Sequence, residues 1–227
     1  MSPSLCEFEK DVAREKRFAD AMSVFHQDPG FAPGILVDHY DFASFHHGVF
    51  VDIGGSLGFI SIDIAKKHPS MQLVVQEHPE VVKEGKEQLP SELANRVTFM
   101  AHDFFTEQPV KNADVYYFRW IFHNWSDKYA VAILKNLIPT LKKGAEVVVS
   151  DLCLPPPGML HAETERTLRI YDLCMMELQN GKEIDSGDWK QLFLDADKRF
   201  VFEGVTQPTG SALAIIEVRW DGDATSK

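Results

Sequence analysis

Short apolar runs alternate with segments of helical periodicity through most of the chain. The runs predict five buried strands: 48–55, 71–77, 96–103, 113–120 and 145–154. The segments between them predict helices at 59–70, 79–89 and 126–144, and Pro79 is well placed at the start of the second. Because strands and helices alternate in this way, we expect a parallel sheet with helices on both of its faces.

The segment 126–144 carries the clearest helical stripe. Its apolar positions recur at intervals of three and four residues: Ala130, Ile133, Leu134, Leu137, Ile138 and Leu141. Ser126 is the predicted N-cap of this helix, and Gly144 is its predicted C-terminal stop. Pro139 has no backbone N–H to donate, so it is expected to kink or divide the helix.

The pattern changes in the last third of the chain. After the Pro-Pro-Pro-Gly of 155–158, residues 162–178 and 187–196 have helical patterns. "RFVFEGVTQ" and "SALAIIEVRW" then follow as two apolar runs joined by a short polar link. These two adjacent strands predict a hairpin that closes one edge of the parallel sheet.

The region before the first strand has a different organisation. Residues 5–25 place Leu5, Phe8, Val12, Phe18, Met22 and Phe25 at roughly helical spacing, which predicts an amphipathic helix ending at the Asp-Pro-Gly of 28–30. A short helix is expected within 35–45. We therefore expect a helical N-terminal segment (1–45), one sheet domain (46–221) and a disordered tail (222–227).

Acidic residues follow three of the predicted strands at the edge where ligands bind in open α/β sheets. Asp52 precedes a turn that contains Gly54 and Gly55, Glu77 ends the second strand, and Asp103 ends the third. A nicotinamide dinucleotide site is the rival interpretation, but a carboxylate beside the turn would repel a pyrophosphate and attract an amine or a sulfonium. The remaining alternative is a loose glycine turn with solvent-facing acids.

Charge and cysteine content narrow the class of partner. The formal net charge of −11 opposes binding to nucleic-acid phosphates or to an anionic membrane. No apolar stretch is long enough to cross a bilayer, and the first residues lack the apolar core of a signal peptide. Cys6, Cys153 and Cys174 show no paired spacing, which argues against a disulfide framework or a metal site and favours a reducing, cytoplasmic setting.

Three motifs carry a family resemblance. "VDIGGSLGFISIDIAKKHP", "RVTFMAHDFF" and "FRWIFHNWSD" resemble the catalytic domain of class I S-adenosylmethionine-dependent O-methyltransferases, in the fungal natural-product group related to plant caffeate and flavonoid enzymes. The resemblance runs from about Phe18 to Trp220. It implies a Rossmann-like fold with a mostly parallel seven-stranded sheet. It also implies S-adenosylmethionine as cofactor, held by these residues: Asp52, Gly54, Gly55, Glu77, Asp103, Phe104 and Arg119.

The resemblance also implies a catalytic set. His123 corresponds to the family's general base, and Asp151 and Glu183 correspond to the two acids beside it. The chain departs from the family pattern in having Asp rather than Glu at 151 and Ile184 where arginine is usual. Taken alone, a histidine in an apolar stretch is more often structural or on the surface than catalytic.

The chemistry expected of such a base limits the substrate. A phenol has an ordinary pKa of about 10 and histidine about 6.5, so proton transfer is uphill unless nearby carboxylates stabilise the imidazolium. Aliphatic alcohols would be far harder to deprotonate, so the site suits phenols, acidic enols or carboxylic acids. Trp120, Met175 and Met176 are candidates for an aromatic substrate pocket, although the methionines fit a core equally well.

Three functions remain open. The first is O-methylation of a small aromatic or polyketide-type hydroxyl. The second is non-methylating chemistry, such as a pericyclic or dehydration step, on the same fold. The third is a non-catalytic partner subunit, because most family members carry a larger N-terminal dimerisation region. A homodimer is expected to be weakened by the shortness of that region here.

Overall fold

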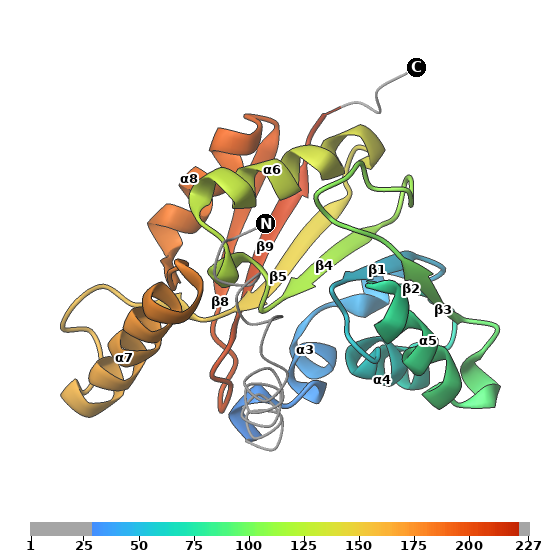
Figure 1. Ribbon diagram of the computed structural model, residues 1–227, viewed down its shortest axis with the longest axis horizontal. Helices are drawn as coiled ribbons and strands as arrows, with labels where there is room; N and C mark the ends of the chain where they lie inside the picture. The colour runs from blue at the N-terminus through green and yellow to red at the C-terminus, as the bar shows by residue number, and fades with distance from the viewer. Residues whose placement is uncertain (1–28, 223–227) are drawn as a thin grey trace.

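Seven strands form the main sheet of the protein, whose computed structural model describes residues 29–222. They are β1 (Val49–Ile53), β2 (Gln72–Glu77), β3 (Val97–Ala101), β4 (Val115–Arg119), β5 (Glu146–Asp151), β8 (Phe200–Thr206) and β9 (Ala214–Trp220). Their order is β3-β2-β1-β4-β5-β9-β8 (Figure 1). The first five are parallel, whereas β9 is antiparallel to both β5 and β8. The predicted parallel sheet with a closing hairpin is confirmed.

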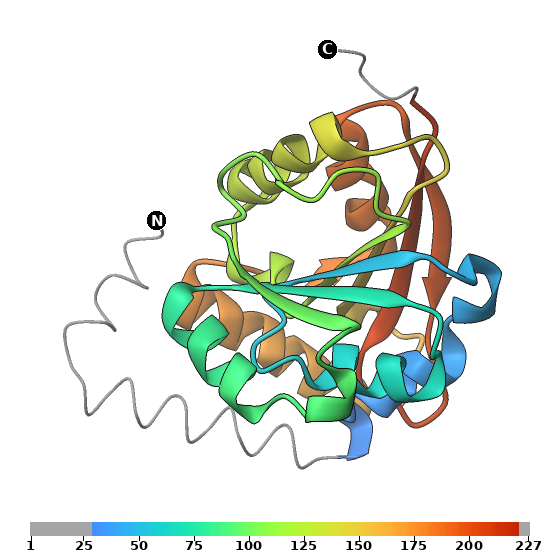
Figure 2. The same cartoon turned by 90° about the vertical axis from the view of Figure 1, so that its right-hand side faces the viewer.

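Helices cover both faces of this sheet (Figures 1 and 2). One face carries α3 (Gly34–His39), α4 (Phe59–Lys67) and α5 (Pro79–Gln88), and the other carries α6 (Asp127–Leu137) and α8 (Ser186–Ala196). Each face has its own buried cluster: Ile64, Val82 and Phe99 belong to the first, and Leu134 and Trp189 to the second. The residues alternate between these clusters along β4, as the two-residue period of a strand requires.

The long helix predicted over 126–144 is shorter than expected. α6 ends at Leu137, and Pro139 lies in a 3-10 turn, Ile138–Thr140, after which the helix does not resume. Pro139 therefore divides the segment as predicted, while Gly144 is not a helix stop. It has a φ of 83° in the turn before β5, and its N–H donates to the carbonyl of Trp220 at 2.8 Å. Ser126 is the N-cap residue, without a side-chain capping bond.

The fifth predicted strand, 145–154, is two strands rather than one. β5 ends at Asp151, and β6 (Cys153–Leu154) leaves the main sheet to pair with β7 (Ile184–Asp185). The sequence gives no sign of β7, because two residues are too few to show a period. This break matters for function, since it leaves Asp151 at the end of β5 and brings the segment at 183 beside it.

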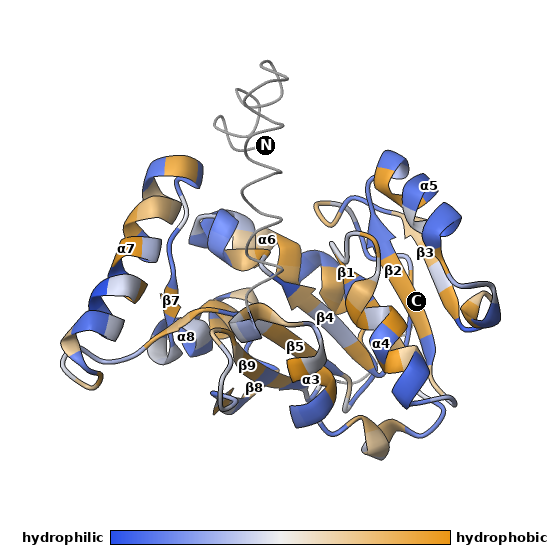
Figure 3. Ribbon diagram, turned by 90° about the horizontal axis from the view of Figure 1, so that it is seen from below, coloured by the Kyte–Doolittle hydropathy of each residue, from blue (hydrophilic) through white to orange (hydrophobic). Residues whose placement is uncertain are grey.

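Between β6 and β7 runs the longest helix in the described residues, α7 (Ala162–Gln179), as predicted for 162–178. It extends to one side of the sheet domain (Figures 1 and 3). Ile170, Leu173 and Met176 are all at least half exposed on it. Gln179 is its one buried residue. None of the helices in residues 29–222 has the length and apolarity that a membrane crossing requires.

The described residues include only the last part of the predicted N-terminal segment. The helix predicted for 5–25 lies outside the described residues, as do 223–227 of the predicted tail. The helix expected within 35–45 is α3 followed by a 3-10 turn, Phe42–Phe45. Leu36, Val37 and Phe42 are buried in the cluster that also holds α4, so this part of the N-terminal segment shares the core of the sheet.

The packing of α6 predicts an unequal response to truncation along that helix. Leu134→Ala should lower the free energy of unfolding by about 2–5 kcal/mol, because Leu134 is fully buried between the sheet and α8. Lys135→Ala, one position further and exposed, should change it by less than about 0.5 kcal/mol. Urea denaturation of both variants measures the difference, and equal losses would show that α6 does not bury this face.

Candidate active site

Most of the predicted site residues lie at one edge of the sheet. Because β1 to β5 are parallel, their carboxyl ends meet there. Asp52 and Glu77 lie at the ends of β1 and β2, and Asp151 ends β5. His123 belongs to a 3-10 turn, Phe122–Asn124, that follows β4. The sheet therefore brings together residues that are a hundred positions apart in the sequence.

The glycine turn is shaped by the protein's own packing. Gly54 has a φ of 71°, and a Cβ atom added there would lie 2.6 Å from Cδ1 of Ile121. A Cβ atom on Gly55 would lie 2.5 Å from the carboxyl carbon of Asp52. The family resemblance implies that both glycines hold the cofactor, and in the structure neighbouring side chains already exclude a Cβ atom at either position.

Asp52 lies beneath the turn rather than on its surface. It is 2% exposed, and the hydroxyl of Ser61 on α4 donates to its Oδ2 at 2.9 Å. Burial raises the pKa of Asp52 to about 6, although the Ser61 hydroxyl and the charge of Arg119 work in the opposite direction. A solvent-facing acid, which the loose-turn alternative requires, is therefore wrong for Asp52.

Glu77 and Asp103 are more accessible, and backbone groups align both carboxylates. Glu77 accepts from the N–H of Ser56 at 3.3 Å and from the N–H of His78 at 2.8 Å. Asp103 is exposed and accepts from the N–H of Phe105 at 2.9 Å. Each carboxylate keeps further acceptor capacity. Their strands are adjacent, so both could accept hydrogen bonds from one ligand that carries hydroxyl and amino donors.

Two other predicted cofactor residues have protein partners. Phe104 is half-buried, and its ring centroid lies 6.1 Å from that of Trp125. The guanidinium of Arg119 donates to the carbonyl of Phe31 at 2.6 Å and lies 4.3 Å from the ring centroid of Trp120. Arg119 thus ties the chain near residue 31 to the end of β4, and its charge reaches Asp52 without a direct contact.

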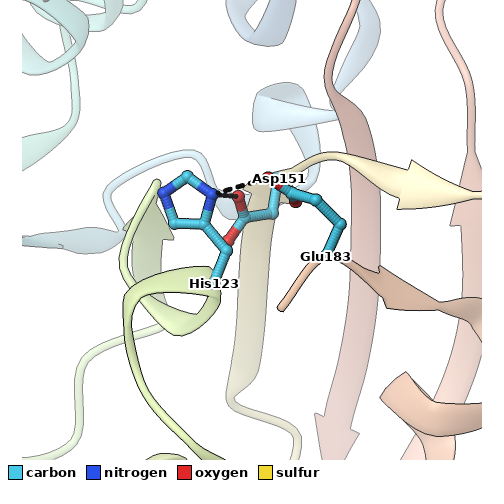
Figure 4. A group of neighbouring side chains, drawn as sticks. All are labelled: His123, Asp151 and Glu183. Carbon is cyan, nitrogen blue, oxygen red and sulfur yellow. Dashed lines mark hydrogen bonds and ion pairs between the residues drawn. The ribbon is translucent and has the colours of Figure 1, made fainter. Parts of the chain in front are cut away.

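His123 faces both of the predicted acids (Figure 4). Its Nδ1 lies 3.1 Å from Oε1 of Glu183, a hydrogen-bond distance, and 3.5 Å from Oδ1 of Asp151, an ion-pair distance. The histidine side chain is 13% exposed, and those of the two acids are 0% and 1% exposed. The second ring nitrogen, Nε2, points away from both carboxylates. The structure therefore confirms that these three residues come together.

The charges of this triad depend on one another. Burial lowers the pKa of His123, but the carboxylates of Asp151 and Glu183 outweigh that effect and raise it to about 9. Burial raises the pKa of Asp151 to about 7, because the neighbouring Glu183 adds to the cost of a second charge while His123 offsets part of it. One nitrogen or oxygen atom from each of the three residues lies within 4.8 Å of the others, so a protonated His123 can interact with both carboxylates.

The segment that carries Glu183 is fixed to α7 and to β6. Asn180 ends α7 in the left-handed conformation, and the N–H of Glu183 donates to Asp172 on that helix at 2.9 Å. Ile184, which departs from the family pattern, is 3% exposed and packs in the core beside Trp189. An apolar side chain at 184 therefore suits its place in β7.

The three predicted pocket residues have different environments. Trp120 is half-buried and has a φ of 54°, an uncommon conformation for a bulky residue. The amide of Asn124 donates to the Trp120 carbonyl at 2.8 Å and closes the turn that carries His123. Met175 is half-buried, whereas Met176 is 57% exposed. The core alternative is therefore wrong for Met176.

Several residues that shape the site were missed in the sequence analysis. Ser61 supports Asp52 and Asp172 supports Glu183, but both lie on helices where a single polar residue carries no motif. Gly181 lies two residues before Glu183 and received no role from the sequence. Its contact with the His123 turn, described below, depends on a chain crossing that no local pattern reveals.

The chain is similar in sequence to known O-methyltransferases. Residues 5–198 match the model of the O-methyltransferase domain. A chlorophenol O-methyltransferase of Trichoderma longibrachiatum is 43% identical over 223 residues, which are 96% of this chain and 48% of the relative. This chain spans about half the length of the curated relatives it matches.

Solved structures share the fold. CalO1, a methyltransferase in calicheamicin biosynthesis in its SAH-bound form, is 25% identical with a TM-score of 0.76, over 94% of this chain and 59% of its own. A structure described as a pericyclic reaction enzyme has 24% identity and a TM-score of 0.68, over 82% of this chain and 47% of its own. The Rossmann-like fold expected from the sequence motifs is confirmed.

Proposed function

Because this chain belongs to the O-methyltransferase family, we propose that it methylates a hydroxyl of a small aromatic or polyketide-type molecule with S-adenosylmethionine as cofactor. The observation that carries the proposal is the buried triad at the sheet edge, in which Nδ1 of His123 faces two carboxylates and Nε2 is left for a substrate. Titratable groups with strongly shifted pKa values and specific charged partners cluster at functional sites, which supports a chemical role for His123.

The residues at the strand ends fit the cofactor. When bound, S-adenosylmethionine supplies a methyl group on a sulfonium. Glu77 would accept from its ribose hydroxyls and Asp103 from its adenine amino group, through the acceptor capacity that their backbone bonds leave free. The buried charge of Asp52 would favour the positive end of the molecule without touching it.

His123 would take the proton that the substrate hydroxyl loses as its oxygen is methylated. The proton passes to Nε2, and the resulting imidazolium is stabilised by Glu183 and Asp151 on the opposite side of the ring. These two acids also fix the orientation of the ring, so Nε2 approaches the substrate oxygen in one geometry. Glu183 and Asp151 act through the histidine rather than on the substrate.

The raised pKa of His123 favours acidic hydroxyls. With a pKa of about 9, only about one histidine in a hundred is neutral at pH 7. A phenol that is itself acidic compensates, because an ionised phenol beside a protonated histidine has the same proton count as the neutral pair. Chlorophenol, the substrate named for one relative, is a phenol of this kind. We therefore place acidic phenols and enols first among the candidate substrates.

The charge and the cysteines of the chain support a small-molecule partner and a cytoplasmic setting. The net charge of −11 disfavours nucleic acid and anionic membranes, and Cys153 and Cys174 are free cysteines. A homodimer stays a prediction.

A panel of phenols of graded acidity tests the proposal. With labelled S-adenosylmethionine, the full chain should methylate the acidic members. For weakly acidic phenols kcat/KM should rise about tenfold per pH unit and level near pH 9, because the base must be neutral. For a phenol with a pKa below 9 the rise should level at that lower pKa. A product of unchanged or dehydrated mass would indicate non-methylating chemistry, and absence of cofactor binding would indicate a partner subunit.

Cofactor affinity should depend on Glu77. Glu77→Gln should weaken S-adenosylhomocysteine binding by ~10- to 100-fold, because an amide accepts fewer hydrogen bonds from ribose than a carboxylate does. Isothermal titration calorimetry measures the affinity. Glu87→Gln is the matched control, since it removes the same charge from the exposed face of α5. If both variants bind equally well, Glu77 does not hold the cofactor.

Replacing the base should affect turnover and not cofactor binding. His123→Asn should lower kcat by ~100- to 10,000-fold on a weakly acidic phenol. The affinity for S-adenosylhomocysteine should stay unchanged, because His123 lies at a different strand end from Glu77. His47→Asn, on an exposed histidine, is the control. Full activity in His123→Asn would remove the general-base role.

A further inference from the structure

Gly181 lies where the segment bearing Glu183 crosses the turn bearing His123. It is buried, and its φ lies outside the left-handed region, so its backbone conformation does not require glycine. A Cβ atom at this position would overlap the carbonyl oxygen of His123 and lie 3.0 Å from the carbonyl carbon of His123 and 3.2 Å from that of Asn124. The obstacle is backbone, which cannot rotate aside as a flexible side chain can. The crossing therefore depends on the missing side chain.

The segment has little freedom to move back from this crossing. The N–H of Gly181 donates to the carbonyl of Met175 at 3.2 Å, and the N–H of Glu183 donates to Asp172 at 2.9 Å. Ile184 pairs with Cys153 in the small sheet. Lys182 lies 3.2 Å from carboxylate oxygens of both Asp127 and Asp188. Added bulk at 181 would have to break some of these contacts or displace the His123 turn.

We propose that Gly181 is a positioning residue for the reaction: by lacking a side chain, it lets the Glu183 segment lie against the His123 turn and so sets the separation of His123 Nδ1 and Glu183 Oε1. The inference rests on the proposed role of His123 as base. The charged groups that face the imidazole are Glu183 from this segment and Asp151 from β5. Lys182 is directed to Asp127 and Asp188.

Gly181→Ala tests the proposal through the histidine itself. Nuclear magnetic resonance of the full chain follows the titration of His123, whose signal is the one lost in His123→Asn. The pKa of His123 should fall by about 1, because Glu183 is pushed away from the ring. On the high-pH plateau kcat should fall by about tenfold, and the rising limb for a weakly acidic phenol should move to lower pH by about one unit. Gly34→Ala, with open space around the added Cβ, should change none of these values.

A double-variant comparison separates positioning from loss of folding. If Gly181 acts through Glu183, then Gly181→Ala should have no further effect on the pKa of His123 in a Glu183→Gln background. If Gly181→Ala lowers the melting temperature and leaves that pKa at its original value, glycine is needed only for packing and the proposal is overturned.

A second pair of variants applies if Gly181→Ala does not fold. Asp172→Ala releases the N–H of Glu183 from α7 and should lower the pKa of His123, whereas Asp172→Asn keeps an acceptor oxygen and should restore it. An unchanged pKa in Asp172→Ala would overturn the proposal. These titrations need no substrate, so a chain that methylates none of the phenols can still show the positioning effect, and the two failures are distinguishable.

Discussion

The charge state of this site depends on two carboxylates that are buried beside one imidazole. Asp151 and Glu183 are almost fully buried, and a pair of buried negative charges is costly unless a cation compensates them. The imidazolium of His123 is that cation. The two carboxylates raise the pKa of the histidine to about 9, whereas burial and Glu183 raise the pKa of Asp151 and the imidazolium works in the opposite direction. The same arrangement would stabilise the imidazolium that forms if His123 takes a proton from a ligand, as the proposed function requires.

The fold assembles the triad from three unrelated parts of the chain. Asp151 comes from the end of a central strand, where the break between β5 and β6 stops the sheet. His123 comes from the turn after β4, which the Asn124 amide closes. Glu183 comes from the far end of α7, returned to the sheet by the two-residue β7. This third part is placed by the hydrogen bond of Glu183 to α7, by the pairing of β7 with β6 and by a close crossing of backbones.

The sequence predicted what local periodicity and motifs encode. The parallel sheet and the closing hairpin were predicted because apolar runs mark buried strands, and the family motifs indicated that Asp151 and Glu183 would lie beside His123. The extent of α6 was overestimated, since Leu141 keeps the apolar spacing after Pro139 has ended the helix and is buried there without being helical. β7 and the role of Gly181 depend on contacts between distant segments, and a pattern of neighbouring residues contains no information about them.

The glycine turn lies close to the segment that carries His123, because a Cβ atom at Gly54 would be 2.6 Å from Cδ1 of Ile121. Gly54 belongs to the turn after β1, and Ile121 lies two residues before His123. A side chain at position 54 would therefore have to displace Ile121, and with it the start of the turn that carries His123. The missing side chain that shapes the glycine turn thus also leaves room for the segment that places the histidine.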